Sequence, residues 1–134
     1  ITEMITGLGE PAFRAKQVIC DYMLQTSWMA ATKGAPFKLG GAKALGLHAG
    51  IHAAFTFIIV VLFAPSLWWL GIADFFIHGT IDKVKANIVT RNNWTYKDTR
   101  YWWAYGLDQE AHNVTHLIYI VIMVWVSGGL CAPA

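Results

Sequence analysis

The chain has 134 residues, of which 56% are hydrophobic and only 13% are charged. An ordinary soluble domain carries about 25% charged residues, so this composition excludes that class and favours an integral membrane protein. Two cysteines are too few for a disulfide framework. We expect residues 1–134 to form a single helical membrane domain. No signal-peptide pattern follows Ile1, and no cleaved leader is expected.

Three segments are predicted to be membrane-spanning helices. A spanning helix needs about 20 mostly apolar residues, and residues 44–64, 67–85 and 101–126 provide them. The segment 12–31 is weaker, because charged and amide side chains interrupt it. The sequence therefore predicts an all-α fold, a bundle of three transmembrane helices with an N-terminal helix that is embedded in the membrane or lies at its interface.

Turns and basic residues predict how these helices are arranged. Pro65 and Ser66 form a short turn, so the second and third helices should be an antiparallel hairpin. Seven basic residues flank the loops at one side of the bundle: Lys33, Lys38, Lys43, Lys85, Arg91, Lys97 and Arg100. The positive-inside rule places these loops in the cytoplasm and both termini outside, in what we take to be the bacterial inner membrane.

Aromatic residues border the same loops. Trp94, Tyr96, Trp102 and Trp103 fit a belt at the inner membrane interface. Trp102 and Trp103 have a second interpretation as core aromatics, because two adjacent positions on a helix cannot both face lipid.

All five histidines and five of the eight acidic residues lie inside the apolar segments. Most are four residues apart, so they stack on one helix face at about 6 Å per step. The series are His48 and His52; Asp74, His78 and Asp82; Asp108, His112 and His116; with Asp21 alone in the first segment. An ionisable group at the bilayer centre costs at least about 2.5 kcal/mol, so these side chains are predicted to face inward.

Depth from the basic ends predicts which of these side chains share a layer. Seven lie about 10–20 Å inward at 1.5 Å per residue: Asp21, His48, His52, His78, Asp82, Asp108 and His112. Four of them should face one cavity, close enough to share an ion or to form hydrogen bonds: His78, Asp82, Asp108 and His112. Asp74 and His116 lie one step deeper and are predicted to support that layer or to form a separate polar pair.

A mixed set of histidines and aspartates from facing helices is typical of metal sites in helical bundles. Histidines four residues apart can bind one ion, and nitrogen with oxygen ligands suits Zn, Mn or Fe. Asp21 or Asp74 could then act as the catalytic base. We predict one or two divalent ions, with these ligands: His48, His52, His78, Asp82, Asp108 and His112.

Single pieces of this pattern have plainer interpretations. His48 and His52 alone could be a packing or hydrogen-bonding pair. Asp82 could form an ion pair with Lys83 or Lys85. The coincidence of three series at one depth is what favours a metal or proton site.

Three motifs follow one another along the chain: Asp-x-x-x-Gln from Asp21, His-x-x-x-Asp-x-x-Lys from His78, and Asp-Gln-x-x-His from Asp108. Together with His48 and His52, their order resembles that of small bacterial and phage-encoded membrane proteins grouped only as a domain of unknown function. The resemblance covers the chain from about residue 18 to 120. It implies a membrane protein and no settled activity.

Several hypotheses for function follow. The first is a membrane-embedded metal-dependent hydrolase acting from the cytoplasmic side on a lipid or lipid-linked substrate, with an oxygen-using di-iron enzyme as a variant. The second is an ion- or proton-handling protein with a relay of aspartates and histidines. The third is a non-catalytic accessory or structural subunit of a larger membrane complex; haem ligation ranks last, because it leaves the aspartates unexplained. The expected partners are membrane lipid and other membrane subunits, with no nucleic acid.

Overall fold

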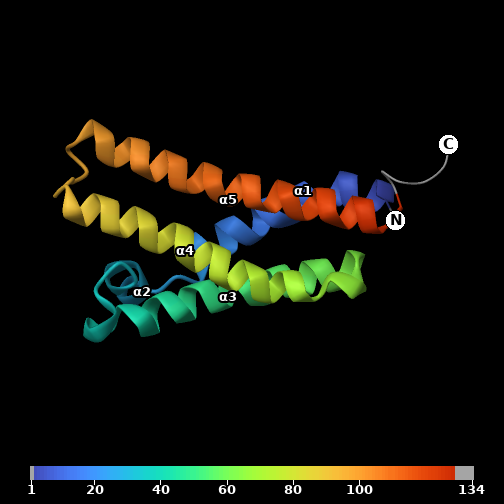
Figure 1. Cartoon of the computed structure of the whole chain (residues 1–134), viewed down its shortest axis with the longest axis horizontal. Helices are drawn as coiled ribbons and strands as arrows, with labels where there is room; N and C mark the ends of the chain where they lie inside the picture. Colours follow the sequence, from blue (N-terminus) through green and yellow to red (C-terminus); the bar gives the residue numbers. More distant parts are fainter. Residues whose placement is uncertain (1, 129–134) are drawn as a thin grey trace.

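The computed structural model describes residues 2–128, and every regular element among them is a helix (Figure 1). The α-helices are α1 (Thr2–Val18), α2 (Ser27–Thr32), α3 (Gly41–Phe63), α4 (Trp69–Arg91) and α5 (Thr99–Val126). Three short turns complete the list of elements: η1 (Ile19–Met23, π-helical), η2 (Phe37–Leu39) and η3 (Pro65–Leu67). The predicted all-α fold is confirmed.

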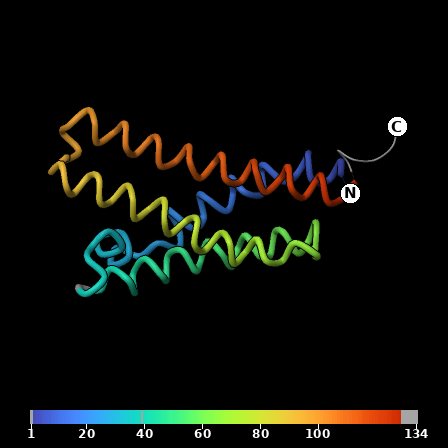
Figure 2. Tube along the Cα trace, in the orientation of Figure 1, coloured from blue at the N-terminus to red at the C-terminus, as the bar shows by residue number. Residues whose placement is uncertain are grey.

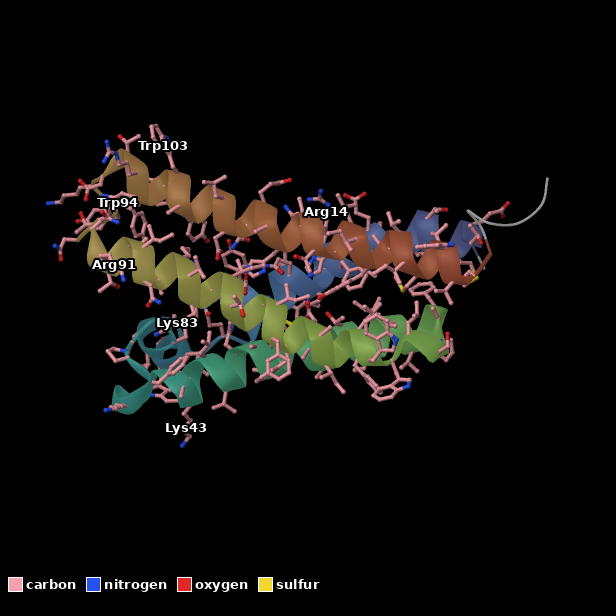
Figure 3. The ribbon with its side chains drawn as sticks, viewed as in Figure 1. Arg14, Lys43, Lys83, Arg91, Trp94 and Trp103 are labelled. Carbon is pink, nitrogen blue, oxygen red and sulfur yellow. The ribbon has the colours of Figure 1, made fainter. Side chains whose placement is uncertain are left out.

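The three long helices lie side by side and alternate in direction (Figure 1). α3 and α4 form the antiparallel hairpin predicted at Pro65 and Ser66, and α5 returns along α4. α1 packs against α3 and α5, so the N-terminus lies near the end of α5 (Figure 2). The η3 turn lies at this same end, whereas the connections that precede α3 and α5 lie at the other end. Lys43, Lys83 and Arg91 lie in that other half (Figure 3).

The apolar core fills the end of the bundle where the N-terminus lies. Ile5 and Phe13 of α1 pack there with Val60 of α3, Leu70 of α4 and Met123 of α5, each at most 2% exposed. α1 thus supplies a fourth side to a bundle of three long helices. Farther along the bundle α1 has ended, and polar side chains occupy the interior.

The N-terminal segment differs from the prediction of one helix over residues 12–31. α1 begins at Thr2, passes into η1 and is interrupted before α2. The interruption has a local cause, because the Thr26 side chain accepts a hydrogen bond from the Met29 N–H and starts a new helix. π-Helical turns are frequent at functional sites, and this one carries Asp21 to the depth at which the interior becomes polar.

A tight connection joins α2 to α3. Gly40 has a φ of +93°, which glycine adopts without strain. Gly41 packs so closely on the Ala35 carbonyl oxygen that a Cβ at this position would collide with it. This connection holds the end of α2 against α3, so that Lys33 reaches His48.

Within residues 2–128, α3 alone is both long and apolar enough to cross a membrane. α4 and α5 have 23 and 28 residues, which exceeds the length of about 20 that a span needs. Aspartates, histidines and lysines lower the mean hydropathy of both helices. Length and composition therefore do not support the predicted bundle of three transmembrane helices for α4 and α5.

The aromatic residues near the basic end lie on the surface. Trp102 and Trp103 are 55% and 64% exposed. The Trp102 indole N–H donates to the Tyr96 carbonyl at 2.7 Å, which fixes one ring across the loop. The interpretation of these two tryptophans as core residues is therefore wrong.

Candidate metal centre

Seven histidines and aspartates meet where α1 has ended. They come from four elements: Asp21 of η1, His48 and His52 of α3, His78 and Asp82 of α4, and Asp108 and His112 of α5. Those on the long helices are at most 5% exposed, and Asp21 is partly buried. The distances between them confirm that they share one layer of the bundle interior.

Asp21 contacts the two histidines of α3. Its Oδ1 accepts a hydrogen bond from His52 Nε2 at 2.8 Å and lies 3.3 Å from His48 Nε2. Its Oδ2 accepts a hydrogen bond from Gln17 Nε2 at 2.7 Å. The carboxylate is therefore held from one side by its own helix and from the other by α3.

Asp82 connects histidines of three helices. Its Oδ1 lies 3.1 Å from His112 Nε2 and is hydrogen-bonded to it. Its Oδ2 lies 3.4 Å from Nε2 of both His48 and His78. This carboxylate is the junction at which the ligand series of α3, α4 and α5 meet.

Lysines border the layer. Lys33 Nζ lies 3.3 Å from His48 Nε2 and 3.5 Å from Asp82 Oδ2. Lys83 donates to a backbone carbonyl of the α2–α3 connection, and Lys85 contacts a different aspartate. The interpretation in which Asp82 pairs with a lysine of its own helix is therefore wrong.

Asp108 lies at the edge of the layer. Its Oδ2 is 3.3 Å from Lys85 Nζ, and its Oδ1 is 3.6 Å from His112 Nε2. Within the described residues this buried Oδ1 has no hydrogen-bond partner. The contacts of Asp108, His112, Asp82 and His78 confirm the prediction that these four residues face one another.

The histidine rings stack through the layer. The ring centroids of His52 and His78 are 3.8 Å apart, and those of His78 and His112 are 4.1 Å apart. Both ring nitrogens of His78 are buried and without a hydrogen-bond partner among residues 2–128, as is Nδ1 of His48 and of His52. Buried polar atoms are nearly always paired, so each exception needs an explanation.

Two groups of these residues could hold a metal ion. One group offers four ligand atoms and the other three, with each set lying within 4.8 Å: Asp21, His48, His52 and His78; and His78, Asp82 and His112. Ligands of a tetrahedral zinc ion lie about 3.3–3.5 Å apart. The nitrogen–oxygen distances of 2.8–3.4 Å within these groups are close to that spacing. His78 belongs to both groups, and one ring nitrogen can bind only one ion at a time.

A second polar network lies one step deeper, around Asp74. Lys16 Nζ donates to Asp74 Oδ2 and to His116 Nε2, both at 3.1 Å. Thr56 donates to Asp74 Oδ2 at 2.9 Å, and Tyr119 donates to Oδ1 at 2.8 Å. Lys16 therefore joins Asp74 and His116 in a separate polar network, which agrees with the second of the two alternatives predicted from their depth.

Five residues that hydrogen-bond within these networks were not assigned to a site from the sequence: Lys16, Gln17, Lys33, Thr56 and Tyr119. In the sequence, Lys16 only makes the first apolar segment less apolar. A lysine inside such a segment requires a buried partner, and that requirement was the available signal. Gln17 and Lys33 gave no comparable signal, because their contacts depend on the break between α1 and α2.

Comparison with known proteins gives a family. The chain belongs to the family described as "Protein of unknown function (DUF3307)", which matches residues 15–131. This range contains every residue of the layer and of the Asp74 network. No curated protein and no solved structure matches the chain. The function must therefore be argued from the site.

Proposed function

We propose that this chain is a metal-dependent hydrolase embedded in a membrane, which acts on a lipid or lipid-linked substrate. His78 carries the proposal, because this buried histidine stacks between His52 and His112. Neither of its ring nitrogens is hydrogen-bonded within residues 2–128, and Nε2 lies 3.4 Å from Asp82 Oδ2. Burying an unpaired polar group is costly unless a ligand binds it. A divalent cation is a ligand that histidine nitrogens and aspartate oxygens can share.

We assign one ion, Zn, Mn or Fe, to His78, Asp82 and His112. Three protein ligands leave a position for water or substrate, as in catalytic zinc sites, whereas the four-ligand group would close the coordination sphere. Such an ion activates water as a nucleophile near neutral pH. His78 is common to both groups, so we assign a single ion rather than two.

Asp21 is the proposed base. It is partly exposed and faces the layer through Oδ1. Asp74 suits this role less well, because it is only 1% exposed and lies in the separate network with Lys16 and Tyr119 rather than in the layer. The remaining residues that the sequence predicts as ligands do not bind the ion in this assignment. They surround His78, Asp82 and His112 and orient them through hydrogen bonds and stacking: His48, His52 and Asp108.

We propose that α3, α4 and α5 all cross the membrane. The polar residues that lower the hydropathy of α4 and α5 include those of the buried layer. The outward faces carry large apolar side chains that are more than half exposed: Ile72, Phe76, Leu107 and Val121. Apolar surface of this kind needs a cover, and lipid would provide it.

The proposed orientation places the basic loops in the cytoplasm and η3 outside, across the bacterial inner membrane. Lys38→Cys and Ser66→Cys, each made in a chain whose own two cysteines are replaced by alanine, would report it. A membrane-impermeant thiol reagent added to intact cells should label position 66 and spare position 38. Labelling of position 38 alone would reverse the orientation.

The activity is tested with protein purified in detergent. We expect one equivalent of Zn, Mn or Fe by elemental analysis, and hydrolysis of at least one substrate in a panel of ester and phosphoester lipids. Chelation should remove the activity, and the same metal should restore it. A protein that contains no metal and takes up none on titration would overturn the proposal.

A proton relay is a second candidate. An unbroken line of contacts runs from Asp21 through His48, Asp82 and His112 to Asp108, with steps of 3.3, 3.4, 3.1 and 3.6 Å. Chains of aspartates and histidines inside a membrane are typical of proton relays. Proton flux into vesicles containing metal-free protein would favour the relay over the hydrolase.

One face of the bundle favours assembly with other membrane subunits. Glu10 and Arg14 form an exposed ion pair at 2.9 Å on α1, and they line a small cavity together with Glu110 and Asn113 of α5. Arg14 lies near the middle of the bundle (Figure 3). Charged side chains at this depth are costly in lipid, so water or a partner subunit would cover them. An accessory role in a complex would use this face.

A further inference from the structure

We propose that a groove between α4 and α5 binds an anionic membrane phospholipid, with its phosphate at the basic end and an acyl chain along the helices. The proposal rests on the hydrolase function above and names the class of substrate. The groove encloses about 620 Å³, which lies within the usual range of about 300–1,000 Å³ for ligand sites.

The walls of the groove suit an acyl chain. α4 contributes Ile81, Val84 and Ile88, and α5 contributes Leu107 and Ala111. These residues recur at three- or four-residue spacing, so each helix presents a continuous apolar strip to the groove. A hydrocarbon chain matches these strips, whose five side chains are all apolar.

The basic end of the groove suits a phosphate. Arg100 lines it at the first turn of α5, is exposed, and makes no ion pair within the described residues. Lys85 lies deeper on the opposite wall, bound to Asp108 at 3.3 Å. Trp94 and Trp103 lie at this end of the molecule (Figure 3), where tryptophan rings commonly meet lipid headgroups. Basic side chains near a membrane surface attract anionic lipids.

The inner wall of the groove reaches the metal centre. Asp108 lines the groove and also lies 3.6 Å from His112. Its buried Oδ1 has no hydrogen-bond partner among residues 2–128. A lipid held in the groove would therefore bring its ester region beside Asp108, which contacts the proposed ligand His112, without having to pass through the packed interior.

The test uses native mass spectrometry of the detergent-solubilised protein with equal amounts of phosphatidylglycerol and phosphatidylcholine. Wild type should retain phosphatidylglycerol preferentially. Arg100→Gln should weaken its binding about fivefold, the contribution of one basic residue near a membrane surface. Ala104→Phe should fill the groove and reduce the binding of both lipids. Arg91→Gln and Ala54→Phe are the matched controls, because both residues are exposed and lie outside the groove.

Metal content and thermal stability of the same samples keep the two proposals separate. Ala104→Phe should retain metal and its melting temperature, which would establish that it is folded. His112→Ala should lose metal and still bind phosphatidylglycerol. Wild-type protein that contains no metal but binds phosphatidylglycerol would overturn the hydrolase proposal and leave the groove proposal standing. Equal retention of both lipids by wild type would overturn the groove proposal. Normal lipid binding by Ala104→Phe would also overturn the groove proposal. Cross-linking that shows a second copy of the chain covering the groove would overturn it as well.

Discussion

The two polar networks of the bundle use the same residue types but differ in how completely their atoms are paired. Around Asp74, both carboxylate oxygens accept hydrogen bonds, and Lys16 bridges Asp74 and His116. In the layer around Asp82, four histidine nitrogens and one oxygen of Asp108 are buried without partners among the described residues. The Asp74 network is complete without a ligand, whereas the Asp82 layer is not.

This difference separates a stabilising role from a binding role. A buried charged network contributes to one defined structure when every member is paired, and partial pairing is costly. The Asp74 network fixes the short helix α1 against α4 and α5 through Lys16. The layer around Asp82 retains buried unpaired atoms, which is expected of atoms that bind a ligand. Substitutions in the two networks should therefore affect different measurements.

The largest expected effect on stability is that of Asp74→Asn. Lys16 would remain buried at 1% exposure without its counter-ion, and breaking a buried ion pair in this way costs about 3–5 kcal/mol. The melting temperature in detergent should fall sharply, while the folded fraction should bind metal as wild type does. Lys16→Met combined with Asp74→Asn is the matched control, because it removes the orphaned charge and should recover most of the loss. A large loss of metal in folded Asp74→Asn would mean that the two networks are not separate.

The second effect is on metal. His112→Ala removes one of three proposed metal ligands. The affinity for the metal should fall by more than about 100-fold, which is the upper limit for replacing a residue that only hydrogen-bonds to a metal ligand. The helices should stay assembled, because their apolar contacts do not involve His112. Elemental analysis and a melting curve on one sample measure both properties. If neither wild type nor His112→Ala contains metal and the variant is markedly less stable, the layer has a structural role.

The sequence predicted the layer better than it predicted its surroundings. Four-residue spacing on a continuous helix places side chains on one face, whatever the neighbouring helices are. The sequence alone could therefore predict that His78, Asp82, Asp108 and His112 face one another. The long helices followed from apolar runs for the same reason. Among these helices, the largest difference between a predicted and an observed end is at α4, which continues to Arg91 rather than to about residue 85.

The N-terminal contacts could not be predicted in this way. The partner of Lys16 lies 58 residues farther along the chain, and no periodicity joins the two. Lys33 reaches Asp82 only because the helix breaks before Thr26 and the chain turns back at Gly40 and Gly41. Such contacts depend on tertiary packing and on single capping residues, which outweigh local apolar patterns.

A smaller effect on stability is expected for Tyr119→Phe. The variant loses the hydrogen bond to Asp74 Oδ1, and a hydrogen bond to a charged group contributes about 1.5–3 kcal/mol. We expect a loss near the lower value, because Lys16 and Thr56 still bind the other oxygen. Denaturant unfolding in mixed micelles would measure it. Unchanged stability with reduced metal binding would contradict the division between the networks.

The smallest effect is expected at the boundary of the layer, where Lys33→Met should strengthen metal binding. The ammonium group lies 3.3 Å from His48 Nε2 and 3.5 Å from Asp82 Oδ2, so it competes with a cation for the same atoms. Lys33 is partly exposed, and a pair of this kind contributes at most about 1 kcal/mol, which corresponds to about a fivefold change in affinity. Lys43→Met is the control, because Lys43 points away from the bundle (Figure 3). Competition titration with a chelating dye would measure both variants. Weaker metal binding in Lys33→Met would mean that Lys33 orients the metal ligands. Lys33 would then stabilise the arrangement of its layer, as Lys16 stabilises that of the Asp74 network.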